Sequence, residues 1–201
     1  MKKILLIGGG GHCKSVIDVI ESDTEFKISG IIDKNPISKH LLGYKIIGTD
    51  AQLEELIMEN LHVLITIGQI KTPNIRKKLF EHSRDLGAIL PVIISKSSYV
   101  SKYAKVGSGS AIMHGAIINA CAIISSNCII NSKCLIEHDA IIGSHSHIST
   151  GAIINGNCSI GEGCFIGSRA IVINGVNIGA NSIIGAGVIV HSDLPPNSFV
   201  R

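Results

Sequence analysis

The residues most able to do chemistry lie in the second half of the chain, in the run Ile136-Glu137-His138-Asp139. A histidine beside a carboxylate is suited to general-base work, because the carboxylate orients the imidazole and stabilises its protonated form. The alternative is an ordinary solvent-exposed loop histidine. The choice depends on what the fold places around His138, and therefore on the elements that position it.

A strict six-residue repeat surrounds this segment. From Val100 to Val190 every sixth residue is Val or Ile, which gives sixteen consecutive hexads without a change of register. We call this first residue of each hexad its lead residue. The fifth residue of each hexad is small almost throughout, and it points to the same side of a strand as the next lead residue, two positions on. This period fits neither an α-helix nor an ordinary strand and is typical of a β-solenoid.

The repeat resembles the left-handed parallel β-helix of the hexapeptide-repeat acyltransferases. In that family three hexads form one triangular coil of about 18 residues, so residue n stacks on residue n + 18. His138 then falls at a corner of the coil, between Ala120 and Gly156 on the neighbouring coils. Both neighbours are small and leave space around the imidazole, which favours a functional role for His138.

The beginning of the chain shows a different pattern. Lys2 to Ile7 reads as a strand, a run of four glycines follows it, and the residues from Ser15 to Ile20 repeat at helical period. A glycine loop between a strand and a helix lets a phosphate approach the backbone at the helix N-terminus. Asp33, at the end of the second expected strand, is placed to bond a ribose or sugar hydroxyl. This unit is half of a dinucleotide domain and is large enough for one nucleotide.

The fold class that follows is α/β plus β-solenoid, with a small Rossmann-like βαβ domain over 1–95 and a left-handed parallel β-helix over 96–201. The net charge of +3 is too small to indicate nucleic acid or a membrane surface as partner. The apolar run at the N-terminus is too short to span a bilayer, and we expect a cytoplasmic protein. Four of the six cysteines occupy the small fifth position, which predicts buried fillers. A helix expected over Pro73–His82 carries three basic residues that should face solvent: Arg76, Lys77 and Lys78.

The whole chain resembles one subgroup of that superfamily, the NeuD/PglD-type sugar acetyltransferases. The resemblance rests on Gly8-Gly9-Gly10-Gly11-His12, on Ile136-Glu137-His138-Asp139 and on Ser146-His147-Ile148-Ser149. It implies an acyltransferase that uses acetyl-CoA as co-substrate, without a metal, to N-acetylate a nucleotide-activated amino sugar of the UDP-4-amino-sugar type. Such reactions serve the biosynthesis of bacterial surface glycans or glycoproteins. O-acetylation of a sialic-type acid is the alternative.

The resemblance also implies roles for single residues. His138 would be the general base, and Asp139 would orient or polarise it. The acceptor would be bound by Gly8, Gly10, Gly11, His12, Asp33, Lys34, Gly68 and Asn131. Acetyl-CoA would contact His147, Gly156, Ile166, Gly167 and Gly185. Relatives usually continue beyond the position of Arg201 with a segment that packs near the CoA, and this sequence ends there.

The spacing of two histidines predicts an oligomer. His147 replaces an aliphatic residue just before a lead, so its ring should point out of the prism, and it lies half a coil from His138. Two such residues converge only across a subunit interface. Most other residues that precede a lead are large and apolar, which is more outward apolar surface than a monomer normally exposes. We expect a homotrimer with active sites between subunits.

Two functions of other classes remain open. One class of trimeric zinc hydro-lyase uses the same helix, and His138, His145 and His147 could suggest its metal site. Their separations differ from the two ligands five residues apart that a resemblance to that class would require. A non-catalytic nucleotide-sugar-binding protein would keep the first domain and lack turnover.

Overall fold

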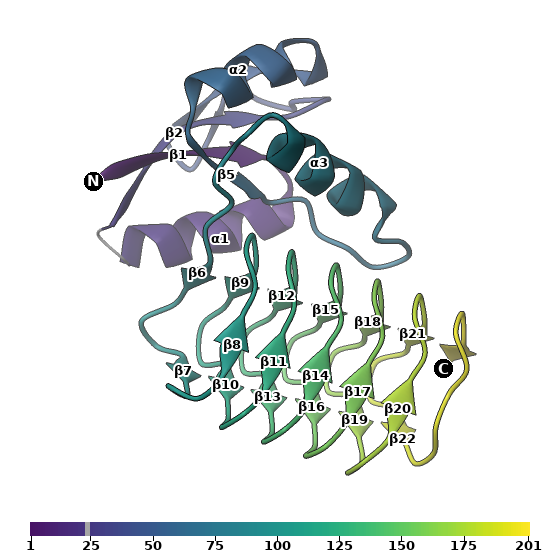
Figure 1. Cartoon of the computed structure of the whole chain (residues 1–201). Helices are drawn as coiled ribbons and strands as arrows, with labels where there is room; N and C mark the ends of the chain where they lie inside the picture. Colours follow the sequence, from purple (N-terminus) through teal and green to yellow (C-terminus); the bar gives the residue numbers. More distant parts are fainter. Residues whose placement is uncertain (23–24) are drawn as a thin grey trace.

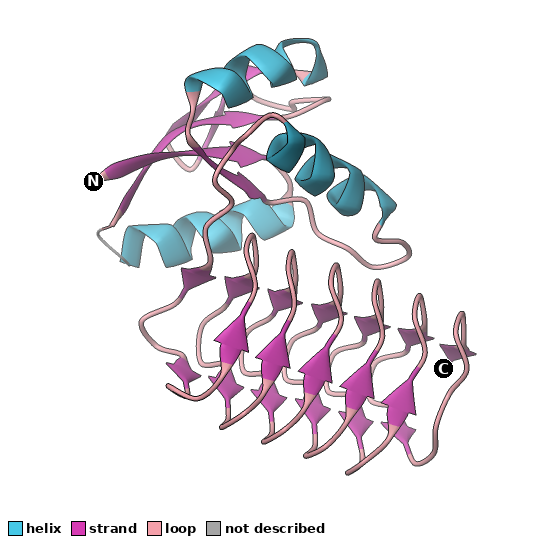
Figure 2. Ribbon diagram, viewed as in Figure 1, coloured by secondary structure: helices cyan, strands magenta, loops and turns pink. Residues whose placement is uncertain are grey.

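The computed structural model describes residues 1–22 and 25–201 and shows two parts packed on each other (Figure 1). The helices belong to the first part, and the second consists of short strands joined by turns (Figure 2). The elements of the first part are β1 (Lys2–Ile7), α1 (Gly11–Ser22), β2 (Phe26–Ile32), β3 (His40–Leu41), β4 (Tyr44–Gly48), the 3-10 helix η1 (Asp50–Gln52), α2 (Leu53–Glu59), β5 (His62–Ile65) and α3 (Asn74–Asp85).

The first part is a five-stranded sheet with helices on both faces. Its strand order is β3-β4-β2-β1-β5, and its pairs are parallel except β3 with β4. Successive side chains along β1 point to opposite faces of the sheet, so the strand packs against the helices on both faces. Ile4 and Leu6 pack in the cluster that includes α1, while Leu5 and Ile7 pack in the cluster that includes α2 and α3. Parallel strands covered on both faces confirm the predicted Rossmann-like βαβ unit.

The second part is a three-sided prism of two-residue strands. They are β6 (Ile93–Ile94), β7 (Tyr99–Val100), β8 (Lys105–Val106), β9 (Ala111–Ile112), β10 (Ile117–Ile118), β11 (Ile123–Ile124), β12 (Ile129–Ile130), β13 (Leu135–Ile136), β14 (Ile141–Ile142), β15 (His147–Ile148), β16 (Ile153–Ile154), β17 (Ser159–Ile160), β18 (Phe165–Ile166), β19 (Ile171–Val172), β20 (Asn177–Ile178), β21 (Ile183–Ile184), β22 (Ile189–Val190) and β23 (Phe199–Val200). Each strand pairs in parallel with the strand one coil away, as in Ile118 with Ile136. The predicted stacking of residue n on residue n + 18 and the β-helix fold are thereby confirmed.

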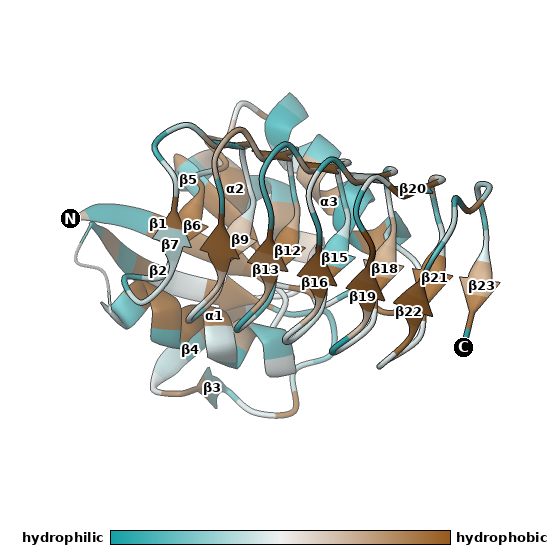
Figure 3. Cartoon of the chain, turned by 90° about the horizontal axis from the view of Figure 1, so that it is seen from below, coloured by the Kyte–Doolittle hydropathy of each residue, from teal (hydrophilic) through white to brown (hydrophobic). Residues whose placement is uncertain are grey.

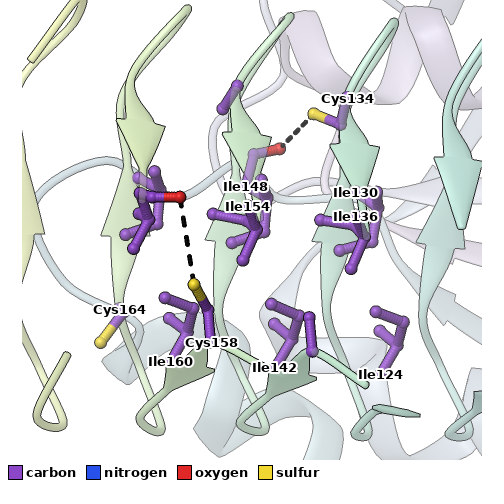
Figure 4. Packing of buried hydrophobic residues seen from close by; sticks show 14 of the residues in the cluster. Ile124, Ile130, Cys134, Ile136, Ile142, Ile148, Ile154, Cys158, Ile160 and Cys164 are labelled. Atoms are coloured by element: carbon purple, nitrogen blue, oxygen red, sulfur yellow. Dashed lines mark hydrogen bonds between the residues drawn. The ribbon is translucent and has the colours of Figure 1, made fainter. Parts of the chain in front are cut away.

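The prism has three faces, which we number. Face 1 contains β6, β9, β12, β15, β18, β21 and β23; face 2 contains β7, β10, β13, β16, β19 and β22; face 3 contains β8, β11, β14, β17 and β20. Face 1 begins at β6, just before the expected domain boundary. The lead residues of the central coils are fully buried inside the prism, where cysteine thiols fill small positions (Figure 4). The thiol of Cys134, for example, donates to the carbonyl of Ile148 at 3.3 Å, and all six cysteines are free.

The first part covers one end of face 1. The outward residues of the first coils on this face, Ala111, Ile129 and His147, are buried, whereas Phe199 of the last coil is 57% exposed. A contact of 2.9 Å between His114 Nε2 and Asp18 Oδ2 ties α1 to the first full coil. Faces 2 and 3 carry exposed isoleucines, and Figure 3 shows the apolar strands of face 2 from β13 to β22.

Candidate active site

A groove of about 940 Å³ opens at the carboxyl ends of the parallel strands β1, β2 and β5, where ligands bind in open α/β sheets. Five of the predicted acceptor-binding residues line it: Gly8, Gly10, Asp33, Lys34 and Gly68. Gly8 has φ +110°, and a Cβ there would lie 2.9 Å from the backbone nitrogen of Ile67, so only glycine fits. The backbone N–H of Gly9 donates to Asp33 Oδ2 at 2.6 Å, so this carboxylate also fixes the loop.

Gly11 and His12 lie beside the groove and do not line it. Gly11 begins α1, and the Cβ of His12 packs against Gly68. Burial, with the nearby charges of Arg76 and His147, lowers the pKa of His12 to about 3. The imidazole is therefore neutral at physiological pH. Its Nε2 atom is buried without a hydrogen-bond partner among the described residues.

His147 lies where the two parts of the molecule meet, and its expected contact with acetyl-CoA stays a prediction. Its ring points out of the prism, as predicted, but the loop after β5 covers it and leaves the residue 7% exposed. Nδ1 donates to the carbonyl of Gln69 at 2.6 Å, and Nε2 accepts from Asn131 Nδ2 at 3.2 Å. The ring also packs edge-on against Phe165. Burial lowers the pKa of His147 to about 4, so the neutral ring spends both nitrogens on contacts within the chain.

Arg76 contradicts the expectation that the basic residues of α3 face solvent, since it is 2% exposed. One guanidinium nitrogen donates to the carbonyls of Ile65 and Ile67 at 2.8 and 2.7 Å, and the other donates to Asn127 Oδ1 at 2.7 Å. Burial lowers the pKa of Arg76 to about 10. The amide of Asn127 in turn contacts His145 Nδ1 at 2.8 Å. Arg76 therefore links the end of β5 to a turn of the prism.

The two neighbouring lysines have other surroundings. Lys77 forms an exposed ion pair with Glu162 of the prism, and Lys78 lines the groove. The difference within this run of three follows from the helix, which turns successive side chains by about 100°.

His138 lies at the edge between faces 2 and 3, in the turn that joins β13 to β14. Its Nδ1 contacts Asp139 Oδ2 at 2.8 Å, and its side chain is 57% exposed. The carboxylate accepts this hydrogen bond, so Nδ1 carries the proton and the Nε2 lone pair is available. The ring lies over Gly156 of the next coil, where a Cβ would come within 2.7 Å of Nε2. The space inferred from the repeat is thus filled by the imidazole.

Three residues that were expected to contact the cofactor lie within the stacked coils of the prism. Ile166 is fully buried inside the prism, so its side chain cannot contact a ligand. Gly167 is closed over by the next coil, because a Cβ there would lie 2.5 Å from the backbone of Gly185. Gly185 itself is covered by the last strand, with Val200 and Arg201 at 3.2 Å from a Cβ. Gly167 and Gly185 allow the close stacking of coils, so the expected cofactor contacts of Ile166 and Gly167 stay predictions that involve the backbone.

The histidines do not form a common metal site. His145 contacts Asn127, His147 contacts Gln69 and Asn131, and His138 lies on the edge opposite face 1. Within residues 1–22 and 25–201, no three His, Cys, Asp or Glu side chains gather where they could hold a metal ion. No helix in these ranges has the length and apolar character to cross a membrane.

The sequence did not reveal the residues that join the two parts. Gln69 and Asn127 occupy positions with no motif, and Arg76 was expected to face solvent, whereas Gln69 and Arg76 are almost completely buried. Gly68, at the end of an expected strand, was predicted to bind the acceptor and not to contact the other part. The one signal for Asn127 is its place in a solenoid turn, where φ is +56° and asparagine is often found.

Both parts of the chain are similar to known protein families. The chain matches the PglD N-terminal domain family over residues 3–83 and the hexapeptide repeat of succinyl-transferase over residues 157–192. A mutant of perosamine N-acetyltransferase from Caulobacter crescentus, in complex with CoA and GDP-perosamine, is 34% identical with a TM-score of 0.94, over 100% of this chain and 94% of that chain.

Two further structures align over almost the whole chain. The acetyltransferase domain of PglB from Neisseria gonorrhoeae FA1090, in complex with acetyl coenzyme A, is 29% identical with a TM-score of 0.93, over 100% of this chain and 96% of that chain. WeeI from Acinetobacter baumannii AYE is 21% identical with a TM-score of 0.76, over 99% of this chain and 96% of that chain, and it shares the fold. No curated protein sequence matches significantly.

Proposed function

Because the chain belongs to the NeuD/PglD-type sugar acetyltransferases of the hexapeptide-repeat superfamily, we propose that it transfers the acetyl group of acetyl-CoA to the amino group of a nucleotide-linked amino sugar. The observation that carries this proposal is the His138–Asp139 pair, whose imidazole is exposed and oriented at 2.8 Å. In this proposal residues 1–95 bind the nucleotide, and residues 96–201 carry the transfer chemistry. One similar protein is in complex with CoA and GDP-perosamine, and another is in complex with acetyl coenzyme A. These complexes support a nucleotide-linked amino sugar and acetyl-CoA as the two substrates.

The proposed chemistry needs one base. The acceptor nitrogen attacks the thioester carbonyl carbon, the new C–N bond forms, and the proton of the nitrogen passes to His138 Nε2. Asp139 stabilises the resulting imidazolium through Nδ1. The C–S bond then breaks, and the proton on His138 passes to the departing thiolate, which restores the neutral imidazole. Backbone N–H groups at the turns of the prism are the donors available for the developing oxyanion.

A single chain does not bring the groove and the proposed base together. The groove belongs to the part that covers face 1, while His138 lies on the opposite edge, with the body of the prism between them. We propose that a homotrimer closes this gap, so that the groove of one copy, with His12 beside it, serves His138 of a neighbour. Ile117, Ile123 and other exposed isoleucines on faces 2 and 3 supply apolar surface for this contact.

The test is a free-thiol release assay with acetyl-CoA against UDP-, GDP- and dTDP-linked amino sugars and sialic-type acids. The sequence favoured a UDP-linked amine, and the relative with GDP-perosamine makes a GDP-linked amine equally important in the panel. The His138→Ala variant should lose about 10²-fold or more in kcat/KM, because a positioned base contributes about 10²–10⁴-fold.

The matched control is His191→Ala, which removes another exposed histidine of the prism. It should leave the rate within about twofold of wild type. Both variants should elute at the mass of the wild-type oligomer in multi-angle light scattering. Wild-type rates in His138→Ala would eliminate this residue as the base. Thiol release with sialic-type acids alone would replace N-acetylation by O-acetylation.

A further inference from the structure

The described residues leave Arg76 as a buried cation without a counter-ion. Its guanidinium is fully enclosed, and no carboxylate among the described residues lies within ion-pair distance of it. Its partners are the carbonyls of Ile65 and Ile67 and the side chain of Asn127, all formally neutral. A buried charge held only by dipoles is costly, because burial removes its hydration without adding an opposite charge.

This cation lies directly behind the groove. The carbonyl of Ile67, which accepts from Arg76 at 2.7 Å, belongs to a residue that itself lines the groove, next to Gly68. On the other side of Ile67, its backbone nitrogen lies 2.9 Å from the place of a Cβ on Gly8. One residue, Ile67, therefore separates the guanidinium from the glycine loop.

The other groups around the glycine loop are also suited to an anion. The N-terminus of α1 points its unpaired N–H groups toward the loop, and no acidic residue occupies the first turn of this helix. Lys34 and Lys78 line the groove. The Nε of Arg76 and the Nε2 of His12 are buried atoms without hydrogen-bond partners among the described residues. The carboxylates of Asp33, Glu54, Glu81 and Asp85 also line the groove, and none of them lies within ion-pair distance of Arg76.

We infer that Arg76 is a positioning residue whose buried charge holds the diphosphate of the acceptor at the glycine loop, without touching it. The inference rests on the proposed function, because it takes a nucleoside diphosphate as the ligand. A charge in a poorly hydrated site acts over several ångströms, since little water screens it. Arg76 also binds Asn127 of the prism, so the same side chain ties the diphosphate site to the domain contact.

The experiment separates the charge of Arg76 from its structural bonds. Dissociation constants of GDP, UDP, guanosine and uridine are measured by isothermal titration calorimetry for wild type, Arg76→Met, Arg76→Lys and Asn127→Ala. Arg76→Met should weaken the binding of GDP and UDP by about tenfold or more. A unit charge about 8 Å from a phosphate, at an effective dielectric of about 20, changes the dissociation constant by at least that factor. The nucleosides should change by less than about threefold.

The two other variants serve as controls. Arg76→Lys keeps a charge and a donor, and is the variant most able to fold; it should retain the preference for diphosphate over nucleoside within about threefold. Asn127→Ala loses the structural bond and keeps the charge, so it should retain the preference as well. The inference would be overturned if Arg76→Met weakened the binding of nucleosides and diphosphates equally. Loss of the preference for diphosphate in Arg76→Lys would also overturn it, as would the same selective loss in Asn127→Ala. A wild-type protein that binds no nucleoside diphosphate would overturn the proposed function, and this inference with it.

Discussion

The substitution of Gly156 by alanine tests the base without removing it. A Cβ on Gly156 would lie 2.7 Å from both Cε1 and Nε2 of His138 and 3.0 Å from Asn174 Oδ1. Ordinary contacts of a Cβ begin at about 3.4 Å, so the imidazole has to give way. The backbone at Gly156 has no positive φ, and alanine is compatible with it. The new methyl group therefore acts on the ring and not on the coil.

The size of the effect follows from these distances. The ring must move by roughly 1 Å, and a misplacement of that size in a reacting group costs about 10²-fold in rate. Stability should change little, because the side chain of His138 is 57% exposed and can swing into solvent. We expect the free energy of unfolding to stay within about 1 kcal/mol of wild type.

The assay is a double-mutant cycle on kcat/KM in the thiol-release reaction, with Gly156→Ala, His138→Ala and the double variant. If the methyl group acts through the imidazole, it should cost nothing further once the imidazole is gone. Additive losses in the double variant would refute the reasoning, because they would give Gly156 a role independent of His138. A rate for Gly156→Ala within about threefold of wild type would refute it equally.

Two further predictions concern the contact between the two parts. Asn127→Ala removes an acceptor of the buried Arg76 and should lower the free energy of unfolding by about 2–3 kcal/mol, measured by urea denaturation. The pKa of His147 falls from 6.5 to about 4 in the folded chain, so the unfolded chain binds more protons between these values. Stability should therefore decline as the pH falls from about 6.5 to about 4, by about 3 kcal/mol from this group, and the decline in thermal midpoint should be smaller in His147→Gln.

The repeat made the prism predictable in detail. Each lead residue has only one place that satisfies a branched apolar side chain, inside the coil, and a six-residue period permits no slip of register. For that reason the stacking of His138 over Gly156 could be inferred from a difference of 18 in residue number, and the pairing of Leu135 with Ile153 bears out the register. Local rules of this kind also located the glycine loop and Asp33.

The docking of the two parts could not be predicted in the same way. It depends on single contacts between residues far apart in sequence, such as Arg76 with Asn127, and no period or motif relates their positions. His147 illustrates this limit: the hexad gave the direction of its ring, but not that Gln69 would cover it. The side chain of Ile166 lies inside the prism, as its place as a hexad lead indicates.

The position of the first part on face 1 bears directly on the proposed trimer. It covers the outward residues of the early coils on that face, including Ile129, which leaves faces 2 and 3 as the open apolar surfaces of the prism. His138 lies on the edge that these two faces share. A neighbour that buries the exposed Ile117 of face 2 or Ile141 of face 3 would therefore lie beside His138. The apolar surface that favours association and the base that needs a second substrate site occupy the same region, so assembly and catalysis are expected to be lost together.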